Sequence, residues 1–349
     1  MSLSFSQPEI RLRRWSVNRL ALNLLLGVAV WAIVGAGCVC VGSTGQIGWP
    51  ASSAIRDIRV EIVLLSSLIG AALGAAGVVY QAILRNPLAD PYLLGVSSGA
   101  SLCAYAWRFP LVWWSLGESF FAAISQQAFA FGGALTVVAI VLVLATRRGR
   151  LQPVTLLLVG VIVNSINGAL FLLLDALKPQ ITQGIGGPMS FLIGGIQTNL
   201  TRGQEYAAAI VIMAAGIVPF YLAGQLNVAT LNEAEAEALG VRIQRLRWTA
   251  LIAASVITAA AVSISGPIGF VGLICPHMAR KIVGADHRRL LPWATAFGAA
   301  LLCVADAVSR LLVAQKLAGT RLPVGVLTAL LGGPFFLLLL RENKSMRPE

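Results

Sequence analysis

Charged residues are scarce in this 349-residue sequence: Asp, Glu, Lys and Arg make up 11% of the chain, whereas 57% of it is hydrophobic. A soluble domain carries about 25% charged residues. A soluble chain this apolar would lack polar surface to present to water, whereas lipid allows apolar side chains to face outward. The composition therefore excludes an ordinary soluble protein and predicts an integral membrane protein in contact with membrane lipid.

Residues suited to catalysis or metal binding are also few. The chain has two histidines and five cysteines, and none forms a CxxC pair with histidine at the spacing of a metal site. The sequence contains no nucleophile elbow, Walker loop or dinucleotide fingerprint. We therefore expect no metal site, no cofactor bound by this chain and no enzymatic activity. A lipid-modifying enzyme would need a catalytic cluster at one membrane interface, which the sequence does not show.

The net charge of +12 reflects basic residues in short loops rather than a basic helix. This distribution favours a topological role for the charge over nucleic-acid binding, because Lys and Arg gather on the cytoplasmic side of membrane proteins. With the N-terminus inside, 18 of the 26 basic residues lie on the inner side, 7 on the outer side and Arg310 within a span. We expect both termini inside and an even number of spans.

Ten segments are long or apolar enough to be membrane-spanning helices of about 20 residues. The first is too long for the apolar region of a signal peptide. Residues 1–19 and 342–349 are then cytoplasmic, and 20–341 form one ten-helix domain. Two segments are short and one meets its neighbour at Gly266-Pro267, as expected of helices that line a cavity. The ten segments are 20–42, 60–83, 92–108, 120–145, 154–175, 206–224, 248–265, 269–284, 292–314 and 324–340.

Small and charged residues within the spans predict their packing. Gly70, Gly74 and Gly77 share one helical face, which favours close approach of another helix. Asp306 and Arg310 are four residues apart, so they can pair within the membrane. The spans contain no chain of buried carboxylates or histidines, which argues against an ion-driven secondary carrier.

Two inner loops have unusual sequences. In the first, Asp90 can cap a helix that begins at Pro91, and the Ser97-Ser98 pair that follows predicts a cavity wall. In the second, a short acidic helix is expected to end at Gly240. This helix is either a solvated loop or a contact inserted into a soluble partner. Asn232 is its expected cap. Its acidic residues are Glu233, Glu235 and Glu237, and its small apolar stripe consists of Ala234, Ala238 and Val241.

Five ordered blocks resemble the permease subunits of type II ABC importers, the FecCD-type family that takes up iron–siderophore complexes, haem and cobalamin. The resemblance covers about residues 55–341. The blocks are 85–100 (RNPLADPYLLGVSSGA), 160–170 (GVIVNSINGAL), 231–241 (LNEAEAEALGV), 266–289 (GPIGFVGLICPHMARKIVGADHRR) and 322–334 (LPVGVLTALLGGP).

The resemblance implies an all-α fold of ten helices that pairs with a second copy as a homodimer. It also implies two ATP-binding subunits, which use ATP and magnesium, and a soluble substrate-binding protein. Residues 231–241 would be the coupling helix that docks the ATPase, with contacts from Glu233, Glu235, Glu237, Ala238, Leu239, Gly240 and Val241.

The resemblance further assigns residues to the pore, the inner gate and the outer surface. The pore between the two subunits would be lined by Ser97, Ser98, Asn164, Ser165 and Asn167, whose alternative role is hydrogen bonding between helices. The inner gate would include Gln152, Pro153 and Val154. Docking of the binding protein would use Arg56, Arg59, Arg310 and Arg321.

The implied function is ATP-driven import of iron chelates, either ferric siderophore or haem, across a bacterial inner membrane. A cobalamin importer is the first alternative, and an ion-gradient-driven carrier is a more distant one. The chain departs from the family at two docking positions. The second arginine of an Arg-x-Pro-Arg pair is missing after Arg59, and Arg321 stands where many relatives have Glu.

Overall fold

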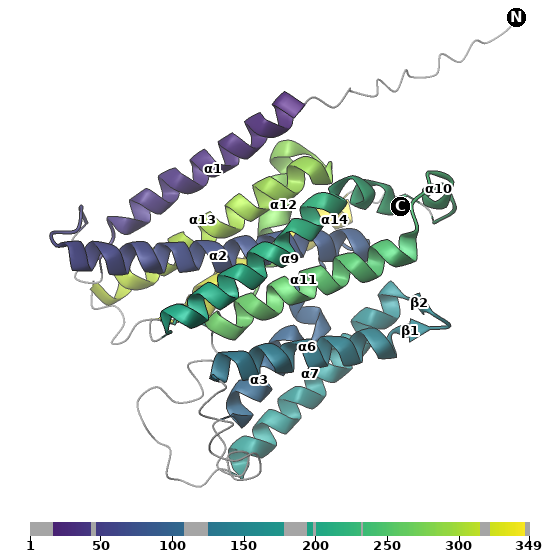
Figure 1. Ribbon diagram of the computed structural model, residues 1–349, viewed down its shortest axis with the longest axis horizontal. Helices are drawn as coiled ribbons and strands as arrows, with labels where there is room; N and C mark the ends of the chain where they lie inside the picture. Colours follow the sequence, from purple (N-terminus) through teal and green to yellow (C-terminus); the bar gives the residue numbers. More distant parts are fainter. Residues whose placement is uncertain are drawn as a thin grey trace, which may run out of the picture.

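The computed structural model describes residues 17–42, 47–107, 125–177, 194–197, 200–231, 233–314 and 322–345. Over these residues the chain is a bundle of helices with one two-stranded hairpin (Figure 1). The helices are α1 Val17–Val39, α2 Ser53–Ile83, η1 Pro91–Leu94, α3 Val96–Ala106, α6 Gln126–Leu144, α7 Pro153–Ala176, α9 Arg202–Ala229, α10 Glu233–Ala238, α11 Ile243–Ser265, α12 Val271–Val283, α13 His287–Ala314 and α14 Val324–Ser345. The strands are β1 Thr146–Arg147 and β2 Arg150–Leu151.

The predicted all-α fold is confirmed, and a helix lies in each of the ten predicted segments. Seven described helices are long and apolar enough to cross a membrane: α1, α2, α6, α7, α9, α11 and α13. In α14 the apolar stretch is Val324–Leu337. Helices α3 and α12 have 11 and 13 residues, or about 17 and 20 Å at 1.5 Å per residue, less than the hydrocarbon core of about 30 Å. These are the two segments expected to be short.

Several helix boundaries differ from the prediction. Helix α2 begins at Ser53 and α9 extends over Arg202–Ala229, so both are longer than the predicted apolar segments 60–83 and 206–224. Residues 120–124 of the fourth predicted segment lie outside the described residues. The break between α11 and α12 is where it was expected, because α11 ends at Gly266, whose φ of 67° suits glycine.

Helices α2 and α13 touch through their backbones. A Cβ atom added to Gly70 would lie 2.1 Å from the carbonyl oxygen of Gly298, and one added to Gly74 would lie 2.3 Å from that of Ala294. On the same face, a Cβ at Gly77 would lie 2.0 Å from the Gly272 oxygen in α12. The predicted close packing of this glycine face is confirmed. We call α2, α11, α12 and α13 the scaffold.

Helices α3, α6 and α7 with η1 form a second layer beside the scaffold, below α11 in Figure 1. We call these four elements the α7 group. The main contacts of α7 are with α3, α6 and η1, whereas α11 contacts α3 and α6. In the apolar stretch of α7 only 22% of residues are buried, compared with 78% in α2 and in α11. The α7 group is therefore joined to the scaffold mainly through α3 and α6.

One end of the bundle brings together α10 and the β1–β2 hairpin (Figure 1). The hairpin turns through Arg148 and Gly149, both at positive φ, as in a type I′ turn. Helix α10 contacts both α9 and the start of α11. The acidic segment therefore lies at the same end of the bundle as Gln152 and Pro153, where α7 begins.

Candidate functional site

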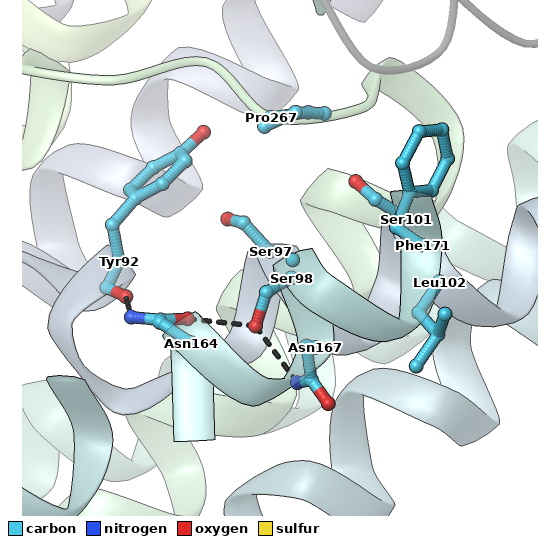
Figure 2. A pocket seen from close by; sticks show the side chains of 10 residues that line it. Tyr92, Ser97, Ser98, Ser101, Leu102, Asn164, Asn167, Phe171 and Pro267 are labelled. Carbon is cyan, nitrogen blue, oxygen red and sulfur yellow. Dashed lines mark hydrogen bonds between the residues drawn. The ribbon is translucent and has the colours of Figure 1, made fainter. Parts of the chain in front are cut away.

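A cavity of about 400 Å³ lies between α3, α7 and η1 (Figure 2). None of its described lining residues is charged, and hydroxyl, amide and aromatic groups predominate. The lining residues are Tyr92, Ser97, Ser98, Ser101, Leu102, Asn164, Asn167, Gly168, Phe171 and Pro267. Four of the five predicted pore residues, Ser97, Ser98, Asn164 and Asn167, are therefore together on one cavity.

Three hydrogen bonds at the cavity wall join α7 to α3 and η1. The Ser98 hydroxyl donates to Asn164 Oδ1 over 2.7 Å, and Asn167 Nδ2 donates to Ser98 Oγ over 2.9 Å (Figure 2). Asn164 Nδ2 also donates to the backbone oxygen of Tyr92 over 3.0 Å. These residues thus line a cavity and hold helices together, as the alternative role predicted, and their place in a pore between two subunits stays a prediction.

Two further hydroxyls are buried against the same cavity. Among the described residues, neither Ser97 Oγ nor Tyr92 Oη makes a hydrogen bond of normal geometry within the protein. Figure 2 shows the Ser97 hydroxyl and the Tyr92 ring bordering the open space below Pro267. The Tyr92 and Ser97 side chains are close enough to interact with each other, and together they keep hydrogen-bonding capacity for a polar occupant of the cavity.

Ser165 is the predicted pore residue that does not line this cavity. It lies on the exposed side of α7, where its hydroxyl donates to the backbone oxygen of Val161 over 3.1 Å. The sequence prediction also missed Ser101 and Phe171 in the lining. Helical spacing could have found both, because they follow Ser97 and Asn167 by four residues on the same helix face.

The residues predicted for the inner gate form the start of α7. Gln152 precedes the helix, Pro153 occupies its first turn, and the Val154 side chain is 71% exposed. Two side chains of α11 bind the preceding strand at Leu151. Gln244 Oε1 accepts the Leu151 N–H over 3.0 Å, and Arg247 Nη1 donates to the Leu151 oxygen over 3.4 Å.

Helix α10 is the acidic segment predicted for ATPase coupling. It ends as expected at Gly240, whose φ is 78°, with bonds from Gly240 N to Glu237 O (2.9 Å) and from Val241 N to Ala236 O (3.0 Å). Ala236 is buried against the chain, whereas Glu237 and Leu239 are exposed. Residue 232, the predicted cap, lies outside the described residues.

The rest of α10 also offers its side chains outward. Ala234, Glu235 and Ala238 are exposed, and Val241 is half-buried. In the expected apolar stripe, Ala234 and Ala238 are therefore on the surface, whereas Val241 packs against the core of the bundle. Glu233 forms an ion pair of 2.7 Å with Arg247, whose side chain is only 7% exposed. The sequence prediction did not include this arginine.

The inner loop before η1 has the geometry that the sequence predicted. Asp90 caps η1 by accepting the Tyr92 N–H over 3.0 Å, and Pro91 occupies the first helical position. Burial raises the pKa of Asp90 to about 6, although hydrogen bonds from backbone groups of Tyr92 and Phe270 lower it. Arg85 begins this loop and donates to the Ala229 oxygen over 3.1 Å, at the end of α9.

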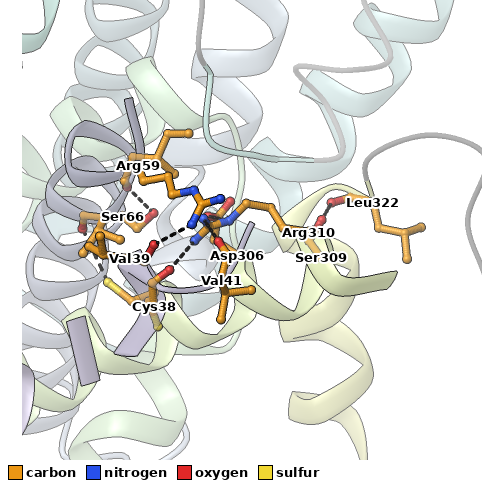
Figure 3. A network of polar contacts seen from close by, with 12 residues as sticks. Cys38, Val39, Val41, Arg59, Ser66, Asp306, Ser309, Arg310 and Leu322 are labelled. Carbon is orange, nitrogen blue, oxygen red and sulfur yellow. Dashed lines mark hydrogen bonds and ion pairs between the residues drawn. The ribbon is translucent and has the colours of Figure 1, made fainter. Parts of the chain in front are cut away.

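Arg310 is buried, which contradicts its predicted role as a docking residue. Its guanidinium pairs with Asp306 over 3.0 Å, so the alternative prediction of an intramembrane pair is confirmed. It also donates to the backbone oxygens of Val41 (2.6 Å) and Cys38 (3.2 Å) (Figure 3). The end of α1 leaves carbonyl groups without helical partners, and Arg310 is held inside because it binds them.

The other docking candidates have different placements. Arg59 donates to the Val39 oxygen over 3.1 Å and also supports the end of α1 (Figure 3). Arg56 and its neighbour Asp57 are exposed and lie 3.3 Å apart. Arg321 lies outside the described residues. Arg56 and Arg59 remain predictions for docking.

The histidines of the described chain are in structural contacts. His287 Nδ1 lies 2.8 Å from Asn227 Oδ1, and the His277 ring meets Phe335 edge-on with centroids 5.7 Å apart. Among the described residues, no three His, Cys, Asp or Glu side chains gather in a group that could hold a metal ion. The geometry around these histidines is that of packed side chains.

Comparisons with known proteins agree on one family. The model of the FecCD transport family matches residues 20–342. The cobalamin import system permease protein BtuC of Halobacterium salinarum is 39% identical, with 86% of this chain and 77% of the relative covered. The hemin transport system permease protein HmuU of Yersinia pestis is 37% identical, with 83% and 84% covered.

A solved structure has the same fold over most of the chain. It is described as an inward-facing conformation of a metal-chelate type ABC transporter. The TM-score is 0.72 at 26% sequence identity, with 92% of this chain and 99% of the solved chain covered.

Proposed function

Because this chain belongs to the FecCD transport family of ABC importer permeases, we propose that it imports iron chelates, either ferric siderophore or haem. The family match over residues 20–342 carries this proposal. The ATPase of such importers lies in partner subunits, so this chain supplies the path and its partners supply the energy. It binds no cofactor of its own and works in a bacterial inner membrane.

The cavity between α3 and α7 is one wall of the path. Its described lining has hydroxyls, amides and aromatic rings without charge, which suits transient contact with a large chelate. The path is completed by a second copy of the chain in a homodimer. The exposed face of α7 supports this arrangement, because Val154, Leu158 and Ile162 are 71%, 61% and 58% exposed.

Helix α10 couples the permease to the ATPase. Its exposed acidic side chains and the 63% exposed Leu239 form a projecting contact at the hairpin end of the bundle. On the opposite end, Arg56 and Arg59 at the start of α2 contact the soluble binding protein. Cargo enters from that side, closure of the two ATPases on ATP displaces α10, and the path alternates its access between the two sides.

Cobalamin import is the second candidate, since the halobacterial relative at 39% identity is named a cobalamin permease. Molecular size does not separate the two candidates, because haem, ferric siderophores and cobalamin are all far larger than the described cavity of about 400 Å³. The binding protein can select the cargo before it reaches this chain.

Uptake into proteoliposomes tests the proposal. The permease is reconstituted with its ATPase and binding protein, and ferric siderophore, haem and cobalamin are compared with ATP inside. We expect ATP-dependent uptake of an iron chelate. Uptake of cobalamin alone would establish the second candidate. Uptake that follows an ion gradient without ATP would contradict both.

A further inference from the structure

The first turn of α11 binds two segments that are far apart in the sequence. Gln244 and Arg247 are three residues apart and both reach Leu151 on β2, one by the backbone N–H and the other by the backbone oxygen. Arg247 also pairs with Glu233 at the start of α10 over 2.7 Å. One side chain therefore contacts both α10 and the strand that leads into α7.

Arg247 is the buried partner in this double contact. Its side chain is 7% exposed, whereas that of Glu233 is 47% exposed. A buried guanidinium needs its partners, since an uncompensated charge is expensive away from water. The planar fork of arginine can serve a carboxylate and a carbonyl oxygen at once, which the single ammonium group of lysine does less well.

Few contacts separate α10 from the start of α7 in space. Leu151 is followed by Gln152, and α7 begins at Pro153. The hairpin is paired through Thr146 with Leu151 and Arg147 with Arg150, so Leu151 connects to both strands and, through Gln152, to the first turn of α7. The main contacts of α7 with the rest of the bundle are to α3, α6 and η1, and its start has an exposed side at Val154 and a buried side at Leu156.

We propose that Arg247 is a positioning residue that transmits the displacement of α10 to the β1–β2 hairpin and to the start of α7. The inference rests on the proposed function, in which the ATPase moves α10. Displacement of Glu233 pulls on the guanidinium, and the guanidinium draws the Leu151 carbonyl with it. The opening of the path at Val154 thus depends on Arg247.

Arg247→Met tests this link, because methionine keeps an unbranched side chain and removes both polar contacts. The complex with ATPase and binding protein is assayed for assembly, ATP hydrolysis and uptake. A spin label on Val154→Cys, in a background without the native cysteines, reports ATP-dependent change at α7. We expect assembly and hydrolysis to persist, the label response to disappear, and uptake per ATP to fall about tenfold, within the 5–150-fold range of ordinary couplings.

Arg245→Met is the matched control, since Arg245 is exposed on the same helix and loses the same charge. It should change uptake per ATP by no more than about twofold. Arg247→Lys should lie between Arg247→Met and wild type. An Arg247→Met complex with the wild-type label response and uptake per ATP would overturn the proposal.

A second variant keeps the test decisive if Arg247→Met does not assemble. Glu233→Ala removes the carboxylate that pairs with Arg247 and leaves the Leu151 contact in place. The label response at residue 154 must then fall, and an unchanged response would overturn the proposal. The proposed function fails separately, when the wild-type complex shows no ATP-driven uptake.

Discussion

Helices α2 and α7 are both apolar and both long enough to cross a membrane, but they are held in different ways. Helix α2 meets α13 and α12 backbone to backbone, through Gly70, Gly74 and Gly77. Helix α7 makes one such backbone contact, at Gly160 against Leu93 of η1, and is otherwise held by hydrogen bonds of Asn164 and Asn167, with most of its surface exposed. A helix packed along most of its length has little room to shift, whereas a helix packed on one side, against elements of its own layer, can move with that layer.

The scaffold and the α7 group therefore have different roles. The scaffold provides a fixed support, and the α7 group provides the wall that changes during transport. Packed interiors resist gradual deformation, so motion is concentrated where contacts are few. Substitutions in the scaffold should therefore reduce stability, and those around α7 should reduce coupling.

Gly77→Ala should prevent accumulation of folded protein. The added Cβ would lie 2.0 Å from the backbone oxygen of Gly272, which cannot move without separating α2 from α12. Gly168→Ala on α7 is the matched control, because a Cβ there meets no described atom within 4 Å. Yield and thermal unfolding in detergent would measure both. Equal stability of the two variants would remove the distinction between the regions.

Arg310→Met should destabilise the scaffold by about 3–5 kcal/mol, because it leaves the buried carboxylate of Asp306 without its partner. The affinity for the binding protein should change far less than with Arg56→Met. Thermal unfolding and binding-protein titration separate the two effects. A stable Arg310→Met variant with lost docking would restore the outer role predicted from the family.

Gly240→Pro should uncouple ATP hydrolysis from uptake by tenfold or more on the scale of typical coupling energies of about 1–3 kcal/mol. Proline cannot adopt the φ of 78° and lacks the N–H that binds Glu237 O. Charge reversal of Glu233, Glu235 and Glu237 should act in the same direction. Uptake per ATP in vesicles is the measurement, and unchanged coupling would exclude α10 as the ATPase contact.

Asn167→Ala should cost only about 0.6 kcal/mol, the average for side-chain hydrogen bonds between membrane helices. It removes the bond to Ser98 that joins α7 to α3. A spin label at residue 154 should show α7 more mobile without ATP, whereas thermal unfolding should hardly change. Loss of folded protein would mean that α7 belongs to the rigid part of the molecule.

Asp90→Asn should have little effect at acidic pH, and its effect should grow as the pH rises. Because the folded pKa of Asp90 is raised to about 6, the wild type loses stability as the pH rises through that value. Asparagine can still accept the Tyr92 N–H and does not ionise. The melting temperature of the wild type should fall relative to the variant between pH 5 and pH 8. Parallel melting curves at both pH values would contradict the shift.

The features that the sequence predicted well depend on neighbours in the chain. The cap at Asp90, the helix end at Gly240 and the Asp306–Arg310 pair all involve residues within five positions of one another. Apolar segments of 20 residues likewise predict helices without knowledge of their partners. These local rules were enough to predict the fold class and the position of the acidic helix.

The features that the sequence did not predict depend on distant partners. Arg310 is held by Cys38 and Val41, about 270 residues away, so its burial could not follow from its own helix. The role of Arg247 depends on Glu233 and Leu151, which come from two different segments. Ser165 carries the same polar character as Asn164 and Asn167, and only the rotation of α7 separates it from the cavity.

The glycine contact between α2 and α13 also determines how long α2 remains without its packing partner during membrane insertion. The partner of Gly70 is Gly298, so more than 200 residues are added before this contact can form. At about 5–20 residues per second, synthesis of that stretch takes roughly 10–50 s. During this interval α2 sits in the bilayer, or against the insertion machinery, with its small-residue face uncovered. Until the ninth predicted span is inserted, the nascent chain is therefore exposed to mispairing of α2 with other helices.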